Sequence, residues 1–130
     1  MNPFTIKFLY KIIGLGSASG LVYMDNSLFV ISDNSSFLYE YKLQENELSK
    51  IKLFENNQEN IPKKDKFDFE AITLKEDTLH LFGSGSTSKR EKRIIYNLDS
   101  KKTEEKELSN LYKKLKENHS IADDELNIEG

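Results

Sequence analysis

The sequence predicts an all-β protein made of antiparallel four-stranded meander repeats. Three observations support this fold class. The chain aligns with itself over most of its length, and each copy of the repeat divides into four short segments separated by turn-forming residues. Within each copy, polarity rises from the second segment to the fourth. Period and polarity together indicate two consecutive antiparallel sheets.

The repeat places Ser19–Asn34 on Glu70–Gly85 without a gap. Four extra residues enter at the polar turn that follows, and the alignment then resumes. Apolar class is kept at the matched pairs Leu21 with Ile72, Leu28 with Leu79, Tyr39 with Ile94, Tyr41 with Tyr96, and Leu53 with Leu108. Because the only gap falls in a turn, where repeats tolerate insertions, we interpret the pattern as an internal duplication.

Each copy contains four expected strands. Those of the first copy are Gly20–Met24, Leu28–Ile31, Phe37–Leu43 and Glu47–Leu53. Those of the second copy are Ala71–Leu74, Leu79–Phe82, Lys92–Leu98 and Lys102–Leu108. Asp, Asn and Ser separate most of them, and these side chains bond the local backbone in turns.

The strands differ in how much burial they predict. Leu28–Ile31 is apolar at every residue, so both of its faces should be covered. Lys102–Glu107 is almost entirely charged and should be an exposed edge, since burying it would cost too much desolvation. Buried inner strands beside a polar outer strand are typical of a propeller blade, so we predict two blades of an incomplete β-propeller.

The domain organisation follows from this interpretation, with residues 1–130 forming a single domain fragment. Apolar and polar residues alternate from Phe4, which predicts a strand at 4–13 that completes the last blade and closes the ring. Blades are expected at 19–54 and 69–108. A connector at 109–127 has helical spacing after Ser109, the expected N-cap. Residues 128–130 repeat the pattern of Phe69–Ala71, which predicts the start of a third blade and an N-terminal fragment of a longer protein.

Composition excludes several classes of function. The net charge is -3 and the charges alternate in sign, so no basic footprint for nucleic acid is present. There is no cysteine, hence no disulfide and no thiolate metal site. No apolar run approaches the ~18 residues of a membrane span. A segment at 8–20 has the small residues of a signal peptide, but Lys11 interrupts its apolar part, so we predict a cytoplasmic protein.

Two glutamates are the candidate metal ligands. Glu70 and Glu129 occupy equivalent positions at the start of the innermost strand of a blade, where carboxylates from several blades converge. Such oxygens suit Ca²⁺, which takes more ligands than two side chains supply. The alternative is that each glutamate caps a neighbouring backbone or pairs with a lysine.

The candidate ligand-binding residues lie in the hairpin Gly83–Arg90 and are Ser84, Gly85, Ser86, Lys89 and Arg90. Glycines let backbone N–H groups converge on an anion, with hydroxyls and cations beside them. The alternative is a long turn with solvated charges. No catalytic residue is predicted. His80 is expected to be a hydrogen-bonded core residue, and Ser32-Asp33 matches a turn better than a nucleophile.

The sequence resembles calcium-dependent propellers of the senescence-marker lactonase and esterase-like phytase groups at Phe69-Glu70-Ala71-Ile72 and Ile128-Glu129-Gly130. It also resembles uncharacterised bacterial propellers that combine a Gly-Ser-Gly-Ser hairpin with a blade-opening Asn-Ile-Glu-Gly. The resemblance implies calcium in the central channel, although Ser19 stands where the first copy would carry its glutamate.

Two functions therefore stay open, and the sequence does not decide whether the protein is an enzyme. The first is a binding scaffold whose partners are the remaining blades or further copies of the chain. The alternative, from the resemblance, is a calcium-dependent hydrolase of lactone, ester or phosphoester bonds.

Overall fold

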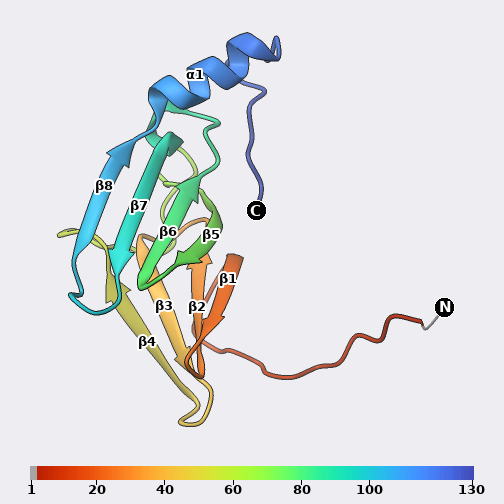
Figure 1. The fold of residues 1–130 in the computed structure, drawn as a ribbon, viewed down its shortest axis with the longest axis vertical. Coiled ribbons are helices and arrows are strands. Elements are labelled where there is room, and N and C mark those ends of the chain that lie inside the picture. The colour runs from red at the N-terminus through yellow and green to blue at the C-terminus, as the bar shows by residue number, and fades with distance from the viewer. Residues whose placement is uncertain (1–2) are drawn as a thin grey trace.

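The computed structural model describes residues 3–130 and contains two antiparallel four-stranded sheets (Figure 1). The strands of the first sheet are β1 (Ala18–Met24), β2 (Ser27–Ser32), β3 (Phe37–Lys42) and β4 (Glu47–Lys52). Those of the second are β5 (Phe69–Lys75), β6 (Thr78–Gly83), β7 (Lys92–Asn97) and β8 (Thr103–Glu107). Both sheets are meanders in chain order, so the predicted all-β fold of two antiparallel four-stranded meanders is confirmed, and it is consistent with two blades of an incomplete propeller.

The strand registers confirm the internal repeat. Leu21 pairs with Val30 in the first sheet, and the matching residues Ile72 and Leu81 pair in the second. Both sheets also carry an irregularity at the same place, just after the first residue of the innermost strand. A shared bulge is a conserved structural feature of duplicated sheets, because it sets the local twist of the strand.

The core lies between the two sheets, and β1 and β5 lie side by side. Its buried apolar residues come from both copies and are Phe29, Ile31, Leu38, Leu53, Phe69, Leu79, Leu81, Ile94 and Tyr96. Gly20 lets the inner strands approach, because a Cβ there would lie 3.2 Å from side-chain carbons of both Ile31 and Ile72. The two sheets thus share one hydrophobic core.

The burial predictions for the strands are confirmed. Phe29, Val30 and Leu81 are almost completely buried, so β2 and β6 are interior strands. All five residues of β8 are exposed and four of them are charged, so this strand is the polar outer edge.

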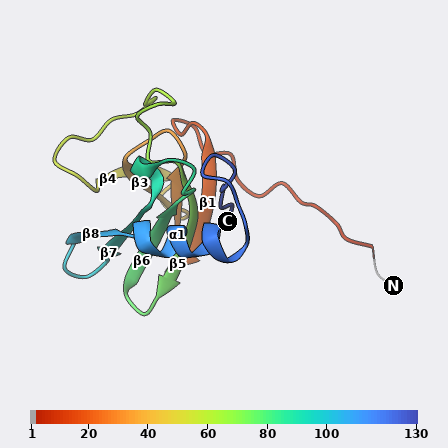
Figure 2. The same ribbon diagram turned by 90° about the horizontal axis from the view of Figure 1, so that it is seen from above.

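Residues 4–13 are assigned no strand, so the predicted strand is not formed within this chain. The segment leads away from the sheets, and Phe4, Ile6 and Phe8 are exposed (Figures 1 and 2). Alternation alone does not make a strand, because the backbone also needs a neighbouring edge to bond with. Its role as a ring-closing strand requires another blade and stays a prediction.

The predicted short helix is present as α1 (Ser109–Asn118). The prediction that Ser109 is its N-cap is wrong. Leu108 is the N-cap, and its side chain makes no capping hydrogen bond. Tyr112 anchors the helix, since it is 1% exposed and its hydroxyl donates to the Gly83 carbonyl over 2.9 Å. None of the helices within residues 3–130 is long and apolar enough to cross a membrane.

Candidate functional site

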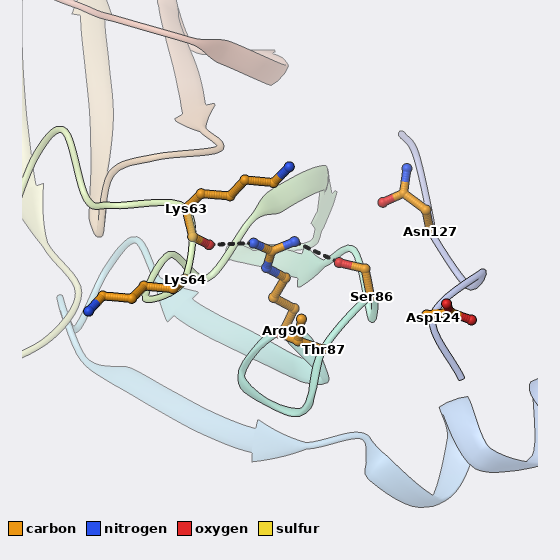
Figure 3. A pocket seen from close by; sticks show the side chains of 7 residues that line it. All are labelled: Lys63, Lys64, Ser86, Thr87, Arg90, Asp124 and Asn127. Atoms are coloured by element: carbon orange, nitrogen blue, oxygen red, sulfur yellow. Dashed lines mark hydrogen bonds between the residues drawn. The ribbon is translucent and has the colours of Figure 1, made fainter. Parts of the chain in front are cut away.

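A cavity of about 630 Å³ lies beside the hairpin that joins β6 to β7 (Figure 3). Three segments far apart in the sequence form it: the loop before β5, the hairpin itself, and the C-terminal segment after α1. The lining residues are Lys63, Lys64, Ser86, Thr87, Arg90, Asp124 and Asn127. The cavity therefore forms beside the turn that carries the four extra residues of the second repeat.

The hairpin backbone is closed by its own hydrogen bonds. Gly85 adopts a φ of 74°, a conformation that favours glycine, and its N–H donates to the Arg90 carbonyl over 2.9 Å. Gly83 sits so close to Arg90 that a Cβ there would overlap the Arg90 carbonyl oxygen. A 3₁₀ turn at Ser88–Arg90 completes the hairpin. These contacts give the rim of the cavity a defined shape.

The orientation of the Arg90 side chain is fixed by three hydrogen bonds from its guanidinium group. Its guanidinium donates to Asp68 Oδ2 over 3.2 Å, to Ser86 Oγ over 2.7 Å and to the Lys63 carbonyl over 2.6 Å. Figure 3 shows it between the Lys63 carbonyl and the Ser86 side chain. An arginine has more N–H donors than these bonds use, and its orientation is fixed before any ligand arrives.

The five predicted ligand-binding residues separate into three groups. Ser86 and Arg90 line the cavity. Ser84 and Gly85 lie beneath it: Ser84 Oγ donates to Asp68 over 2.5 Å, and the Gly85 N–H is bonded to Arg90. Lys89 points elsewhere and pairs with Asp65 over 2.9 Å. Because the Gly85 N–H is already bonded, side chains rather than a backbone nest supply the positive charge here.

Sequence reasoning missed the lysines of the cavity. Lys63 and Lys64 come from an exposed loop between the two repeats, where no equivalent position marks them. Asp124 and Asn127 belong to the connector after the helix. Only the folded chain brings these residues to the hairpin, so composition and spacing carried no signal for them.

A second cluster lies between the sheets and is acidic. Carboxylate oxygens of Asp33, Asp68 and Glu70 lie within 4.8 Å of one another. Lys66 Nζ bridges two of them, at 3.0 Å from Asp33 and 2.7 Å from Asp68. Since Asp33 follows β2 and Asp68 precedes β5, this lysine ties the two repeats together.

The pKa values of Asp68 and Glu70, two carboxyls of the second repeat, are shifted in opposite directions. Burial would raise the pKa of Asp68, but hydrogen bonds from Lys66 and Ser84 and the charge of Arg90 hold that pKa below its ordinary value. Burial, together with the charges of Asp68, Glu129 and Asp33, raises the pKa of Glu70 to about 7. Glu70 is therefore the carboxyl of this cluster that changes charge near neutral pH.

The predicted metal pair lies in this region, with a different set of neighbours. Glu129 is near enough for its charge to affect Glu70, but its carboxylate accepts a hydrogen bond from Asn127 over 2.7 Å. Asp33 and Asp68 are the carboxylates gathered around Glu70. Carboxylate oxygens suit Ca²⁺, but Lys66 already supplies a cation between two of them, so the cluster as arranged is an ion-pair network and does not fit a calcium ion.

His80 is only partly buried, in contrast to the predicted core position. Its Nε2 lies 3.1 Å from Thr78 Oγ1, so the expected hydrogen bond is present. Burial and the charges of Arg93 and Lys75 lower its pKa. The side chain lies on the face of the second sheet that points away from the core, because Leu79 and Leu81 take the inward positions of the same strand.

Comparison with known proteins gives a family but no activity. A family model covers residues 14–130, and the chain belongs to this family, which is described as a family of unknown function (DUF6929). No curated protein and no solved structure matches the chain significantly. Substrate and partner must therefore be argued from the site itself.

Proposed function

We propose that the chain is a β-propeller segment that acts as a binding scaffold, and that the cavity beside the Gly83–Arg90 hairpin binds a small anion with a carboxylate or phosphate group. The observation that carries this proposal is that Lys63, Lys64 and Arg90 line one cavity in a chain whose net charge is negative. Local positive charge in an acidic protein is the electrostatic requirement for selective anion binding.

The three cations have different roles in this proposal. Arg90 is nearly buried and fixed by Asp68 and Ser86, so it presents an oriented donor at little entropic cost. Lys63 and Lys64 are exposed, and Figure 3 shows the Lys64 ammonium directed away from Arg90, so this side chain has to turn to reach the ligand. Asp124, which contributes to the same lining, favours ligands that also carry a hydrogen-bond donor, since it would repel a bare anion.

Isothermal titration calorimetry with inorganic phosphate and with citrate tests the proposal. The double variant Lys63→Gln/Lys64→Gln should weaken binding about tenfold or more, because each lysine contributes a hydrogen bond to a charged group. Lys114→Gln is the matched control, since Lys114 is an exposed lysine outside the cavity lining. Equal affinity in all three proteins, or absence of heat with both anions, would refute the proposal.

A further inference from the structure

The hairpin cavity has two walls with different chemistry. The first wall carries cations and hydroxyls, and its residues are Lys63, Lys64, Ser86, Thr87 and Arg90. The second wall is the segment after α1, which contributes Asp124 and Asn127. Figure 3 shows these two residues on a separate stretch of chain, across from Ser86 and Arg90. A ligand that fills the cavity therefore meets hydrogen-bond donors with positive charge on one side and oxygen acceptors on the other.

The second wall is fixed to the hairpin by contacts on both sides of Asn127. Leu126 is 8% exposed, and the Ile128 N–H donates to the Ser84 carbonyl over 2.8 Å. The Ser84 hydroxyl in turn lies 3.0 Å from the Ser86 hydroxyl of the first wall. Because Ser84 contacts both walls, their separation is set by the fold before a ligand binds, and no ordering cost is added for it.

The first wall fits a phosphate monoester better than a carboxylate. A guanidinium, two hydroxyls and the Lys63 ammonium lie on it even before Lys64 turns toward the ligand. A carboxylate has two oxygens to accept their bonds. A phosphate monoester has three acceptor oxygens and close to two negative charges at neutral pH, so it uses more of these donors.

The second wall indicates the body of the ligand. The Asn127 amide nitrogen donates to Glu129 over 2.7 Å, which leaves the amide oxygen as an acceptor, and Figure 3 shows this oxygen directed toward the first wall. The Asp124 carboxylate also only accepts. A neutral hydroxyl donates to either oxygen, whereas an ammonium group would be repelled by the lysines of the first wall.

The lining and the size of the cavity narrow the ligand further. None of the described residues that line it is aromatic, so a nucleobase would find no ring to stack on. The cavity volume is about 630 Å³, and inorganic phosphate alone would leave most of this space to water. A polar body with several hydroxyls fits the remaining space and its lining.

We propose that the hairpin cavity binds a phosphorylated sugar or polyol, with the phosphate at Arg90 and Ser86 and the hydroxyls at Asp124 and Asn127. This assignment rests on the anion binding proposed above. It adds the class of ligand and the direction in which the ligand lies, and it concerns binding only.

Isothermal titration calorimetry with a matched set of ligands tests it. The set is glucose 6-phosphate, glycerol 3-phosphate, phosphoethanolamine, inorganic phosphate and glucose. We expect the two phosphorylated polyols to bind about tenfold tighter than inorganic phosphate, because their hydroxyls add hydrogen bonds to the second wall. Glucose should bind more weakly than either, since it lacks the phosphate.

The double variant Asp124→Ala/Asn127→Ala separates the two walls. It should weaken glucose 6-phosphate about tenfold and leave inorganic phosphate unchanged or slightly tighter, because it removes a carboxylate near the anion. Asn118→Ala/Asp123→Ala is the matched control, since it removes the same two residue types from exposed positions outside the lining. Both ligands should bind this control as they bind the wild type, and thermal unfolding establishes that each variant is folded.

The outcomes distinguish the ligand class from the anion site itself. Binding of inorganic phosphate without a gain for either phosphorylated polyol would overturn the ligand class and leave the anion site in place. The absence of heat with every phosphate would refute both proposals. Tighter binding of phosphoethanolamine than of glycerol 3-phosphate, or an unchanged affinity of the double variant for glucose 6-phosphate, would overturn the role given to the second wall.

Discussion

Truncating Tyr112 is expected to destabilise the whole domain, because this residue joins α1 to the hairpin. The ring lies 3.1 Å from where a Cβ of Gly85 would sit, and the hydroxyl donates to the Gly83 carbonyl. Removing a large buried side chain costs about 3–5 kcal/mol, a substantial part of the ~5–15 kcal/mol that stabilises a domain. Tyr112→Phe keeps the ring and loses one bond to a buried carbonyl, which costs about 1–2 kcal/mol.

Urea unfolding followed by far-UV circular dichroism measures these effects, since the chain has no tryptophan to report by fluorescence. Leu111→Ala is the control on the same helix: Leu111 is exposed, and alanine is at least as good a helix former, so a change within about 0.5 kcal/mol is expected. A Tyr112→Ala variant as stable as Leu111→Ala would show that the helix is a solvated connector and would refute the anchoring argument.

Three further predictions concern Glu70, Gly83 and the pair Glu70 and Glu129. The pKa of Glu70 is raised to about 7, so the folded state binds this proton more tightly than the unfolded state, and stability should fall as pH rises from about 4.5 to about 7. Thermal unfolding at a series of pH values should show this fall for the wild type and not for Glu70→Gln. The same pH dependence in both proteins would contradict the prediction. Gly83→Ala should cost more than about 2 kcal/mol by urea unfolding because its Cβ meets the Arg90 carbonyl, whereas Gly16→Ala, with open space around it, should change stability by less than about 0.5 kcal/mol. Because the cluster as arranged does not fit calcium, Ca²⁺ should leave the thermal midpoint of the wild type unchanged; a rise that is lost in Glu70→Gln/Glu129→Gln would contradict this and support calcium at the two glutamates.

The fold was predictable because it depends on residue class at repeated positions. Leu28–Ile31 is apolar throughout and Leu79–Phe82 is apolar except at His80, and the paired sheets bury Phe29, Ile31, Leu79 and Leu81. The segment at 4–13 has equally clear alternation, but a strand requires a partner edge, which is a property of the assembly and not of the segment. Local pattern was sufficient for the first case and insufficient for the second.

The candidate site was only half predictable. Ser86 and Arg90 were identified because the hairpin composition is unusual, and both line the cavity. The other lining residues come from loops that have no equivalent in the first repeat, so no spacing rule reaches them. Asp33 was assigned to a turn from its local sequence, and that assignment could not show that stacking of the repeats brings it to Asp68 and Glu70.

The two copies differ where the candidate chemistry lies. The Asp33 N–H donates to the Ser17 carbonyl in the first repeat, and at matching positions the Ser84 N–H donates to the Asp68 carbonyl in the second. The backbone contact is kept while the acidic and hydroxyl side chains exchange places. This exchange, across the junction of the sheets, places Asp33 of one repeat beside Asp68 of the next, where Lys66 bridges them.

The four-residue insertion likewise builds the hairpin that frames the cavity. Repeated positions build the core and the divergent ones build the sites, so variants for functional tests belong at the divergent positions.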